Sequence, residues 1–216
     1  MKSKPSKKTT HNARRTQDER SEEMRARLLT SSIKMLKVHS YSGFRVADVA
    51  DDAGVSRGAQ VHHFASKDKL VTASLELVFS RALDRTMEAI AKLSSQDKML
   101  EHAFADAEKF FYSDEFFVAL DIVISGYKNG GIADEVRQIA GQYRLAAENA
   151  WIARLVKTGL DPDDAEDILW VMWSVIRGLA VRRQIGPKSS HPQRVTELVL
   201  KLLSNYADTL RRQRYG

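Results

Sequence analysis

The sequence predicts an all-α protein, and three observations support this fold class. The chain has no proline between Pro5 and Pro162, and proline inside a helix removes a hydrogen bond and clashes with the preceding turn. Apolar residues recur at three- and four-residue spacing, which is the period of a helix with one buried face. No segment combines alternating apolar and polar residues with flanking turn residues, the pattern that indicates a β-strand.

The composition is that of a globular protein and excludes several classes. The 216 residues are 43% hydrophobic and 29% charged, and none is cysteine. The missing cysteine excludes a disulfide scaffold, a thiolate metal site and a catalytic thiol, and it suits the reducing cytoplasm, where we expect the protein to act. The longest apolar run, residues 168–173, is far shorter than the roughly 20 residues of a membrane-spanning helix. We therefore expect no membrane partner.

The net charge of +6 is concentrated in the first third of the chain. Residues 1–70 hold 15 Lys and Arg against 8 Asp and Glu, a net +7, whereas the other 146 residues hold 19 against 20. A basic module on a neutral body indicates a polyanionic partner, and the alternative is a basic tail without a partner. Residues 1–17 are predicted as a disordered basic arm that either contacts DNA or only adds solubility. Its cations are Lys2, Lys4, Lys7, Lys8, Arg14 and Arg15.

Local signals place three helices in the basic third. The first begins at a cluster of acidic residues from Asp18, which suit the positive end of a helix dipole, and ends near Ser40, before the turn residues Ser42 and Gly43. Two short helices follow over 46–53 and 56–63.

Longer helices are predicted in the rest of the chain. Their expected spans are 67–93, 97–112, 114–126, 133–157, 162–184 and 192–213. Ser113 is a capping residue for the third of these, and Asp161 followed by Pro162 is a start signal for the fifth.

The two short helices have the pattern of a helix-turn-helix. Gly54 can take a positive φ at the turn, Val55 is placed to fill the angle between the helices, and Ser56 can cap the second helix. The small residues Ala50 and Ala53 let the two helices approach closely. In such a motif the second helix enters the major groove of DNA.

The stretch from residue 44 to residue 70 resembles the DNA-binding domain of the tetracycline-repressor (TetR) family of transcriptional regulators. The residues that carry the resemblance are Val49-Ala50, Ala53-Gly54-Val55-Ser56, Gly58, Phe64, Ser66-Lys67-Asp68 and Leu70. The resemblance implies a three-helix DNA-binding domain over 18–67 and a helical ligand-binding and dimerisation domain over 68–216. Beyond residue 70 only length and helix count agree with the family.

The sequence departs from the family pattern in two places. Phe44 and Arg45 stand where the family usually has Thr, so a hydroxyl cap is missing and Arg45 is instead a candidate phosphate contact. Gln60 and Val61 stand where the family usually has Leu and Tyr, which removes a usual DNA contact.

Base contacts are expected at the start of the second motif helix, from Ser56 onward. Arg57 has the planar fork that matches the O6 and N7 atoms of guanine. Gly58 and Ala59 allow close approach of the backbone, and the Ala59 methyl can meet a thymine methyl. Gln60 either reads adenine or faces inward, and the sequence leaves both orientations open.

Phosphate contacts are implied by the family resemblance at His62, His63 and Lys67. The alternative for the two histidines is a helix-end pair that packs against the domain. Adjacent residues on a helix point in different directions and no carboxylate partner is evident, so no metal site is expected, and no cofactor is expected either.

The last two predicted helices, 162–184 and 192–213, have apolar stripes that suit pairing. The first stripe is Ala165, Ile168, Leu169, Met172, Val175, Ile176 and Leu179, and the second is Val195, Leu198, Val199, Leu202, Leu203, Tyr206 and Leu210. The resemblance implies that both helices form a four-helix interface between two subunits. The alternative is that the stripes pack inside one chain.

The resemblance also implies a pocket for a small-molecule effector in the second domain. The candidate aromatic lining residues are Phe110, Phe117, Tyr127, Trp151 and Trp173, and the candidate polar ones are Asp121 and Arg177. Each aromatic residue has core packing as its alternative, and each polar residue has solvent exposure or a bridge to a neighbour.

These features together predict a ligand-responsive repressor that binds a palindromic operator in double-stranded DNA as a homodimer. The alternative is an architectural DNA-binding protein of low specificity that has no sensor. An enzyme is not expected, because no nucleophile elbow, phosphate loop or HExxH motif is present. The acidic cluster from Asp163 to Asp167 is explained by its place at a helix start.

Overall fold

A computed structural model describes residues 16–94, 98–128, 131–186 and 190–215, and within these ranges the chain forms nine α-helices and no strand. The predicted all-α class is confirmed. The helices are α1 (Gln17–Gly43), α2 (Val46–Ala53), α3 (Arg57–His63), α4 (Lys67–Ala91), α5 (Met99–Phe111), α6 (Asp114–Lys128), α7 (Ala133–Val156), α8 (Pro162–Ile185) and α9 (His191–Tyr215). No helix in the described ranges is long and apolar enough to cross a membrane.

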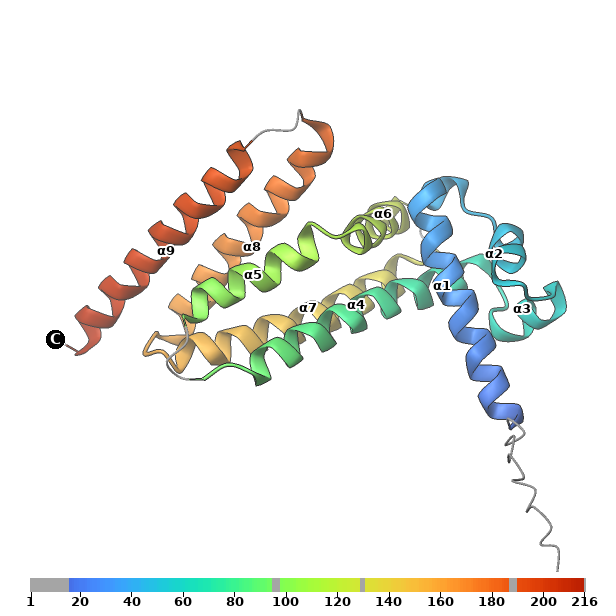
Figure 1. The fold of residues 1–216 in the computed structure, drawn as a ribbon, viewed down its shortest axis with the longest axis horizontal. Helices are drawn as coiled ribbons and strands as arrows, with labels where there is room; N and C mark the ends of the chain where they lie inside the picture. Colours follow the sequence, from blue (N-terminus) through green and yellow to red (C-terminus); the bar gives the residue numbers. More distant parts are fainter. Residues whose placement is uncertain (1–15, 95–97, 129–130, 187–189, 216) are drawn as a thin grey trace, which may run out of the picture.

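The helices form a small head at one end of the molecule and a longer helical body (Figure 1). Helices α1, α2 and α3 make the head, and α4 and α7 run side by side from the head into the body. Helices α8 and α9 lie together at the opposite end, where the chain terminates (Figure 1).

Two hydrophobic clusters hold this arrangement together. The first joins the head to the body, because head residues such as Leu28 and Leu36 share a cluster with Val118 and Ile122 of α6. The second fills the body between α5, α7, α8 and α9 around Trp151, which is fully buried. The first cluster includes residues on both sides of the predicted domain boundary at 67/68, so packing is continuous from the head into α6.

The start of α1 is fixed by a capping box. The Thr16 hydroxyl accepts from the Glu19 backbone N–H at 3.2 Å, and the Glu19 carboxylate accepts from the Thr16 N–H at 2.7 Å. The helix therefore begins at Gln17, one residue before the predicted start. The six cations assigned to the predicted basic arm lie outside the described residues.

The predicted end of the first helix coincides with a break in α1. Ser40 has φ 57° and ψ 172°, a non-helical conformation, and a short helical segment then continues to Gly43. A positive φ on a residue other than glycine is uncommon and strained. Ser40 is the one such residue in the described ranges, and it redirects the chain just before Tyr41.

The capping signals predicted further along the chain are also present. The Ser113 hydroxyl accepts from the Phe116 N–H at 3.1 Å at the start of α6. The Asp161 carboxylate accepts from the Asp163 N–H at 3.2 Å, and Pro162 takes the first position of α8. These local bonds satisfy backbone donors that a helix start leaves without partners.

The α8 stripe that was predicted to pair with a second subunit is instead part of the core of this chain. Ala165, Ile168, Leu169, Met172 and Ile176 are buried in the second cluster. Helices α8 and α9 leave a different set of large apolar side chains exposed. This set is Trp170, Val171, Val181, Ile185, Leu198, Leu202 and Tyr206. Leu198, Leu202 and Tyr206 belong to the predicted stripe of α9, whereas no residue of the predicted α8 stripe is in this exposed set.

Candidate nucleic-acid interface and ligand cavity

The turn between α2 and α3 has the predicted helix-turn-helix geometry. Gly54 takes the left-handed conformation, with φ 61° and ψ 42°. Val55 is buried and its N–H donates to the Ala50 carbonyl at 2.9 Å. The Ser56 hydroxyl accepts from the Ala59 N–H at 3.3 Å and so caps α3.

Helix α1 supplies three side chains that hold α2 and the turn in place, and the sequence pattern did not single them out. Arg27 donates from Nη2 to the Gly54 carbonyl at 3.2 Å and also to the Ala53 carbonyl. Ser31 donates to Asp52 at 2.7 Å, and Lys34 forms an ion pair with the same carboxylate. The hydrogen bonds from Lys34 and Ser31 hold the pKa of Asp52 below its ordinary value. These partners lie 18 to 27 residues apart in sequence, so no local signal connects them.

Replacing Gly54 with alanine is expected to lower the free energy of unfolding by about 1–2 kcal/mol, because an L side chain is strained in the left-handed region. An added Cβ would also lie 2.9 Å from Arg27 Nη2, which would disturb the bonds across the turn. Urea denaturation followed by circular dichroism at fixed protein concentration measures this loss.

The matched control is Gly141→Ala in α7, where an added Cβ meets no atom within 4 Å. This variant is expected to be as stable as the wild type or more stable by up to about 1 kcal/mol, the helix propensity difference. Equal stability of the Gly54→Ala variant and the wild type would contradict the strained-turn argument.

Helix α3 presents one exposed face. Arg57, Gly58, Val61 and His62 are exposed, whereas Ala59 and His63 are half-buried. Val61 is an apolar residue of this face and is 56% exposed. In the sequence Val61 is a departure from the family pattern, and its exposure makes it a candidate for apolar contact with a thymine methyl.

Two orientations were predicted for Gln60, and in the structure its side chain faces inward. Its side chain is buried, and its amide Nε2 donates to the Phe64 carbonyl at 2.8 Å. The amide group therefore stabilises the end of α3, and Gln60 is not available to read adenine in this conformation. The residue sits on the face of α3 that packs against the head, which the short sequence pattern could not distinguish from the outer face.

The four predicted phosphate contacts are Arg45, His62, His63 and Lys67. Arg45 is exposed at the start of α2, where no side-chain cap is present. The His62 and His63 rings lie with centroids 5.5 Å apart. The described residues contain no group of three or more metal-binding side chains. Lys67 is half-buried, because its Nζ donates to the Tyr41 carbonyl at 3.0 Å and lies 4.5 Å from the centroid of the Tyr41 ring.

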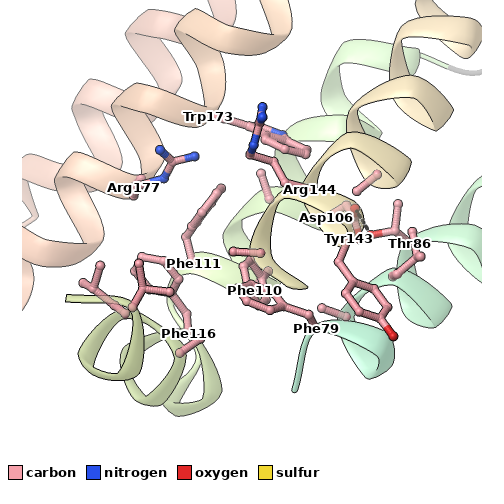
Figure 2. A pocket seen from close by; sticks show the side chains of 18 residues that line it. Phe79, Thr86, Asp106, Phe110, Phe111, Phe116, Tyr143, Arg144, Trp173 and Arg177 are labelled. Carbon is pink, nitrogen blue, oxygen red and sulfur yellow. Dashed lines mark hydrogen bonds between the residues drawn. The ribbon is translucent and has the colours of Figure 1, made fainter. Parts of the chain in front are cut away.

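A cavity of about 270 Å³ lies in the body between α4, α5, α6, α7 and α8. Its walls are mainly aromatic and aliphatic, and Figure 2 shows the rings of Phe79, Phe110, Phe111 and Phe116 around the space. Predicted pocket residues Phe110, Trp173 and Arg177 line it. The lining residues that the prediction missed include Phe79, Thr86, Asp106, Phe111, Phe116, Tyr143 and Arg144.

The other four predicted pocket residues lie outside the lining of this cavity. Phe117 packs against Phe116, and Tyr127 is 72% exposed. Trp151 is in the core, where its Nε1 donates to Asp106 at 2.9 Å. Asp121 accepts from the Tyr41 N–H at 2.6 Å. Aromatic composition alone does not separate cavity walls from core, because both are lined by the same apolar residue types.

Helix α6 connects the cavity to the head. Its residues Phe116, Ala119 and Val123 line the cavity, while Asp121 on the same helix bonds the Tyr41 backbone at the broken end of α1. Lys67, the first residue of α4, bonds the carbonyl of the same tyrosine. The end of α1 is thus held between the cavity helix α6 and the start of α4.

An exposed second helix on a helix-turn-helix head, joined to a helical body with a cavity, is the architecture of a DNA-binding transcriptional regulator. The comparisons agree with this class. Residues 28–74 match the family model described as bacterial regulatory proteins, tetR family. The HTH-type transcriptional regulator CymR of Pseudomonas putida is 36% identical over 189 residues, which is 88% of this chain and 93% of CymR. The chain therefore belongs to the TetR family, as its sequence resemblance predicts.

Solved structures share the fold. A TetR transcription regulator from Haloarcula marismortui superimposes with a TM-score of 0.64 at 16% identity, covering 88% of this chain and 98% of that one. The multidrug binding protein EbrR, solved in complex with imidazole, superimposes with a TM-score of 0.60 at 17% identity, covering 84% of this chain and 93% of EbrR. At these identities the likeness concerns the fold.

Proposed function

We propose that this DNA-binding regulator is a ligand-responsive repressor that binds a palindromic operator as a homodimer. The observation that carries the proposal is the double role of α6, which lines the cavity and also bonds the end of α1 through Asp121. A ligand changes DNA binding only if it favours one conformation over another. Because α6 contacts both the cavity and the head, a ligand that shifts α6 would also shift the end of α1.

DNA recognition is assigned to the exposed face of α3. Arg57 is free to reach guanine in the major groove, and the small residues Gly58 and Ala59 let the helix backbone approach the bases. Val61 is assigned an apolar contact, and phosphate contacts are assigned to Arg45 and His62, which are exposed, and to His63, which is half-buried. Lys67 remains a candidate phosphate contact whose ammonium is shared with the Tyr41 carbonyl.

Dimerisation is assigned to the exposed apolar residues of α8 and α9. Trp170 on α8 and Leu198, Leu202 and Tyr206 on α9 are each at least half exposed, and contiguous exposed apolar surface marks interaction sites. Pairing at this end leaves the two heads free to meet DNA. Helix-turn-helix dimers read half-sites whose centres lie about 34–36 Å apart, which is why we expect a palindrome.

Selection of bound DNA from a random pool, with the purified protein, tests the proposed function. The expected result is a palindromic consensus with two half-sites, and repression is then tested with a reporter gene that carries this operator. Recovery of DNA without a consensus would contradict the proposal and favour an architectural protein of low specificity.

Replacing Arg57 with alanine is expected to cost about 1–3 kcal/mol in operator binding and to relax base preference at one position in each half-site. The physical reason is the loss of two parallel hydrogen bonds to a guanine edge. Fluorescence anisotropy with the selected operator and its single-base variants measures both effects at a stated salt concentration.

Arg81→Ala is the matched control for this substitution. It removes the same charge from an exposed position of α4 outside the head, so operator affinity and base preference are expected to stay at wild-type values. Unchanged base preference in Arg57→Ala would overturn the assignment of Arg57 as a base-reading residue.

A further inference from the structure

The polar groups that line the cavity are mostly supplied with partners by the protein. Asp106 accepts from the Thr86 hydroxyl at 2.7 Å and from Trp151 Nε1 at 2.9 Å, both on the same carboxylate oxygen. Arg144 donates to both oxygens of the buried carboxylate of Glu148, at 2.8 and 2.7 Å. These bonds account for the one acid on the wall and for one of its two cations.

Two hydrogen-bond donors on the wall remain without an acceptor. The indole Nε1 of Trp173 is buried and has no hydrogen-bond partner among the described residues. Arg177 is exposed, at the solvent side of the lining, and its guanidinium has no hydrogen bond or ion pair within the described part of the chain and lies 5.0 Å from the centroid of the Phe111 ring. Partial burial of the guanidinium lowers the pKa of Arg177, while Glu148 raises it and Arg144 lowers it.

The two donors come from one face of α8. Trp173 and Arg177 are four residues apart, so their side chains lie one above the other on the helix. Figure 2 shows both at the same side of the cavity, with Phe79, Phe110 and Phe116 at the opposite side. The cavity therefore has a donor-rich, cationic edge and an apolar aromatic body.

We propose that this cavity binds a compact aromatic carboxylate, with the carboxylate held by Arg177 and the Trp173 N–H and the ring held among Phe110, Phe111 and Phe116. A carboxylate supplies the two acceptors that these donors lack, and its shape matches the guanidinium fork. The volume of about 270 Å³ lies just below the usual range of ligand sites, roughly 300–1,000 Å³, which restricts the ligand to a small molecule. This assignment rests on the proposed function, in which the cavity is the effector site.

A cationic ligand is the competing class, because aromatic rings attract cations and Asp106 lies on the wall. The Arg177 guanidinium, which has no carboxylate partner in the described part of the chain, opposes it by charge repulsion, whereas Arg144 is already paired with Glu148. The Asp106 carboxylate is also already engaged by Thr86 and Trp151. At the cationic edge the donors of Trp173 and Arg177 have no acceptor from the described residues of the protein, whereas the Asp106 carboxylate already has donors. This difference favours an anionic ligand.

Calorimetric titration of the full-length protein, in the absence of DNA, tests the assignment. The ligands are cinnamate, cinnamamide and cinnamylammonium, which share one hydrocarbon frame and differ in charge. Cinnamate is expected to bind at least about tenfold more tightly than cinnamamide, the difference that a charged hydrogen bond makes. In the Arg177→Gln variant this tenfold preference is expected to disappear, while the affinity for cinnamamide stays within about twofold of the wild type.

Two further variants complete the experiment. Arg182→Gln removes a cation from an exposed position of the same helix outside the lining and is expected to keep the tenfold preference. Arg177→Lys keeps the charge without the planar fork and is expected to show an intermediate preference, which serves as the test if Arg177→Gln does not fold.

Three results would overturn the assignment: tighter binding of cinnamylammonium than of cinnamate, a tenfold preference that survives in Arg177→Gln, or no binding of any of the three ligands. Because no DNA is present, these failures are distinct from failure of the proposed function. Operator selection without a consensus would contradict the proposed repressor function. The proposed ligand class would then still be decided by the titration alone.

Discussion

Replacing Trp151 with alanine is expected to lower the free energy of unfolding by about 3–5 kcal/mol, the range for truncating a large buried aromatic side chain. Trp151 is fully buried at the centre of the second cluster, and its removal would leave a cavity among α5, α7 and α8. It would also leave Asp106 with one donor fewer, which adds the cost of a polar group that has lost a partner. Urea denaturation monitored by circular dichroism at fixed protein concentration gives the change.

Two variants separate the packing effect from the hydrogen bond. Trp151→Phe keeps most of the buried ring but removes the N–H, so it is expected to cost less than Trp151→Ala. Tyr127→Ala removes an aromatic ring that is 72% exposed and is expected to stay within about 0.5 kcal/mol of the wild type. If Trp151→Ala were as stable as Tyr127→Ala, the assignment of Trp151 to the core would fail.

Replacing Leu202 with glutamate is expected to convert the proposed homodimer to a monomer. Leu202 is 57% exposed on α9, between the exposed residues Leu198 and Tyr206, and a charge at a paired apolar surface loses its hydration without gaining a partner. Loss of the second head removes the avidity of two linked sites, so affinity for the palindromic operator is expected to fall by about 100-fold or more. Analytical ultracentrifugation measures the subunit number, and fluorescence anisotropy measures the affinity.

Gln193→Glu is the matched control, because it introduces the same charge at an exposed position of α9. Residue 193 is nine positions from Leu202, which places it on the opposite side of the helix. This variant is expected to remain a dimer with wild-type operator affinity. A Leu202→Glu protein that still sedimented as a dimer would show that the subunits pair elsewhere.

The helices were predictable because their signals are local. The cap at Ser113, the Asp161–Pro162 start and the left-handed Gly54 each act within a few residues of themselves, and each occurs in the structure as predicted. The family was predictable for the same reason, since the residues that carry the resemblance lie in one continuous stretch around the turn between α2 and α3. The family model matches residues 28–74, which include all of that stretch.

The orientation of individual side chains was less predictable. Gln60 has a polar side chain on a helix expected to meet DNA, yet it is buried and bonds the Phe64 carbonyl. The stripe of α8 around Ile168 is apolar enough to pair with a second subunit, yet it packs inside the chain. In both cases the sequence leaves open what the side chain contacts, and only the position of the neighbouring helices determines it.

The cavity and its link to the head depend entirely on tertiary structure. Asp121 and Tyr41 are 80 residues apart in sequence, and Arg27 and Gly54 are 27 apart. By itself the sequence determined the helices, their caps, the helix-turn-helix and the excess of basic residues in the first third of the chain, because each depends on near neighbours or composition. Tertiary structure decided which aromatic residues surround the cavity and which donors there lack partners, because these depend on where helices distant in sequence come together.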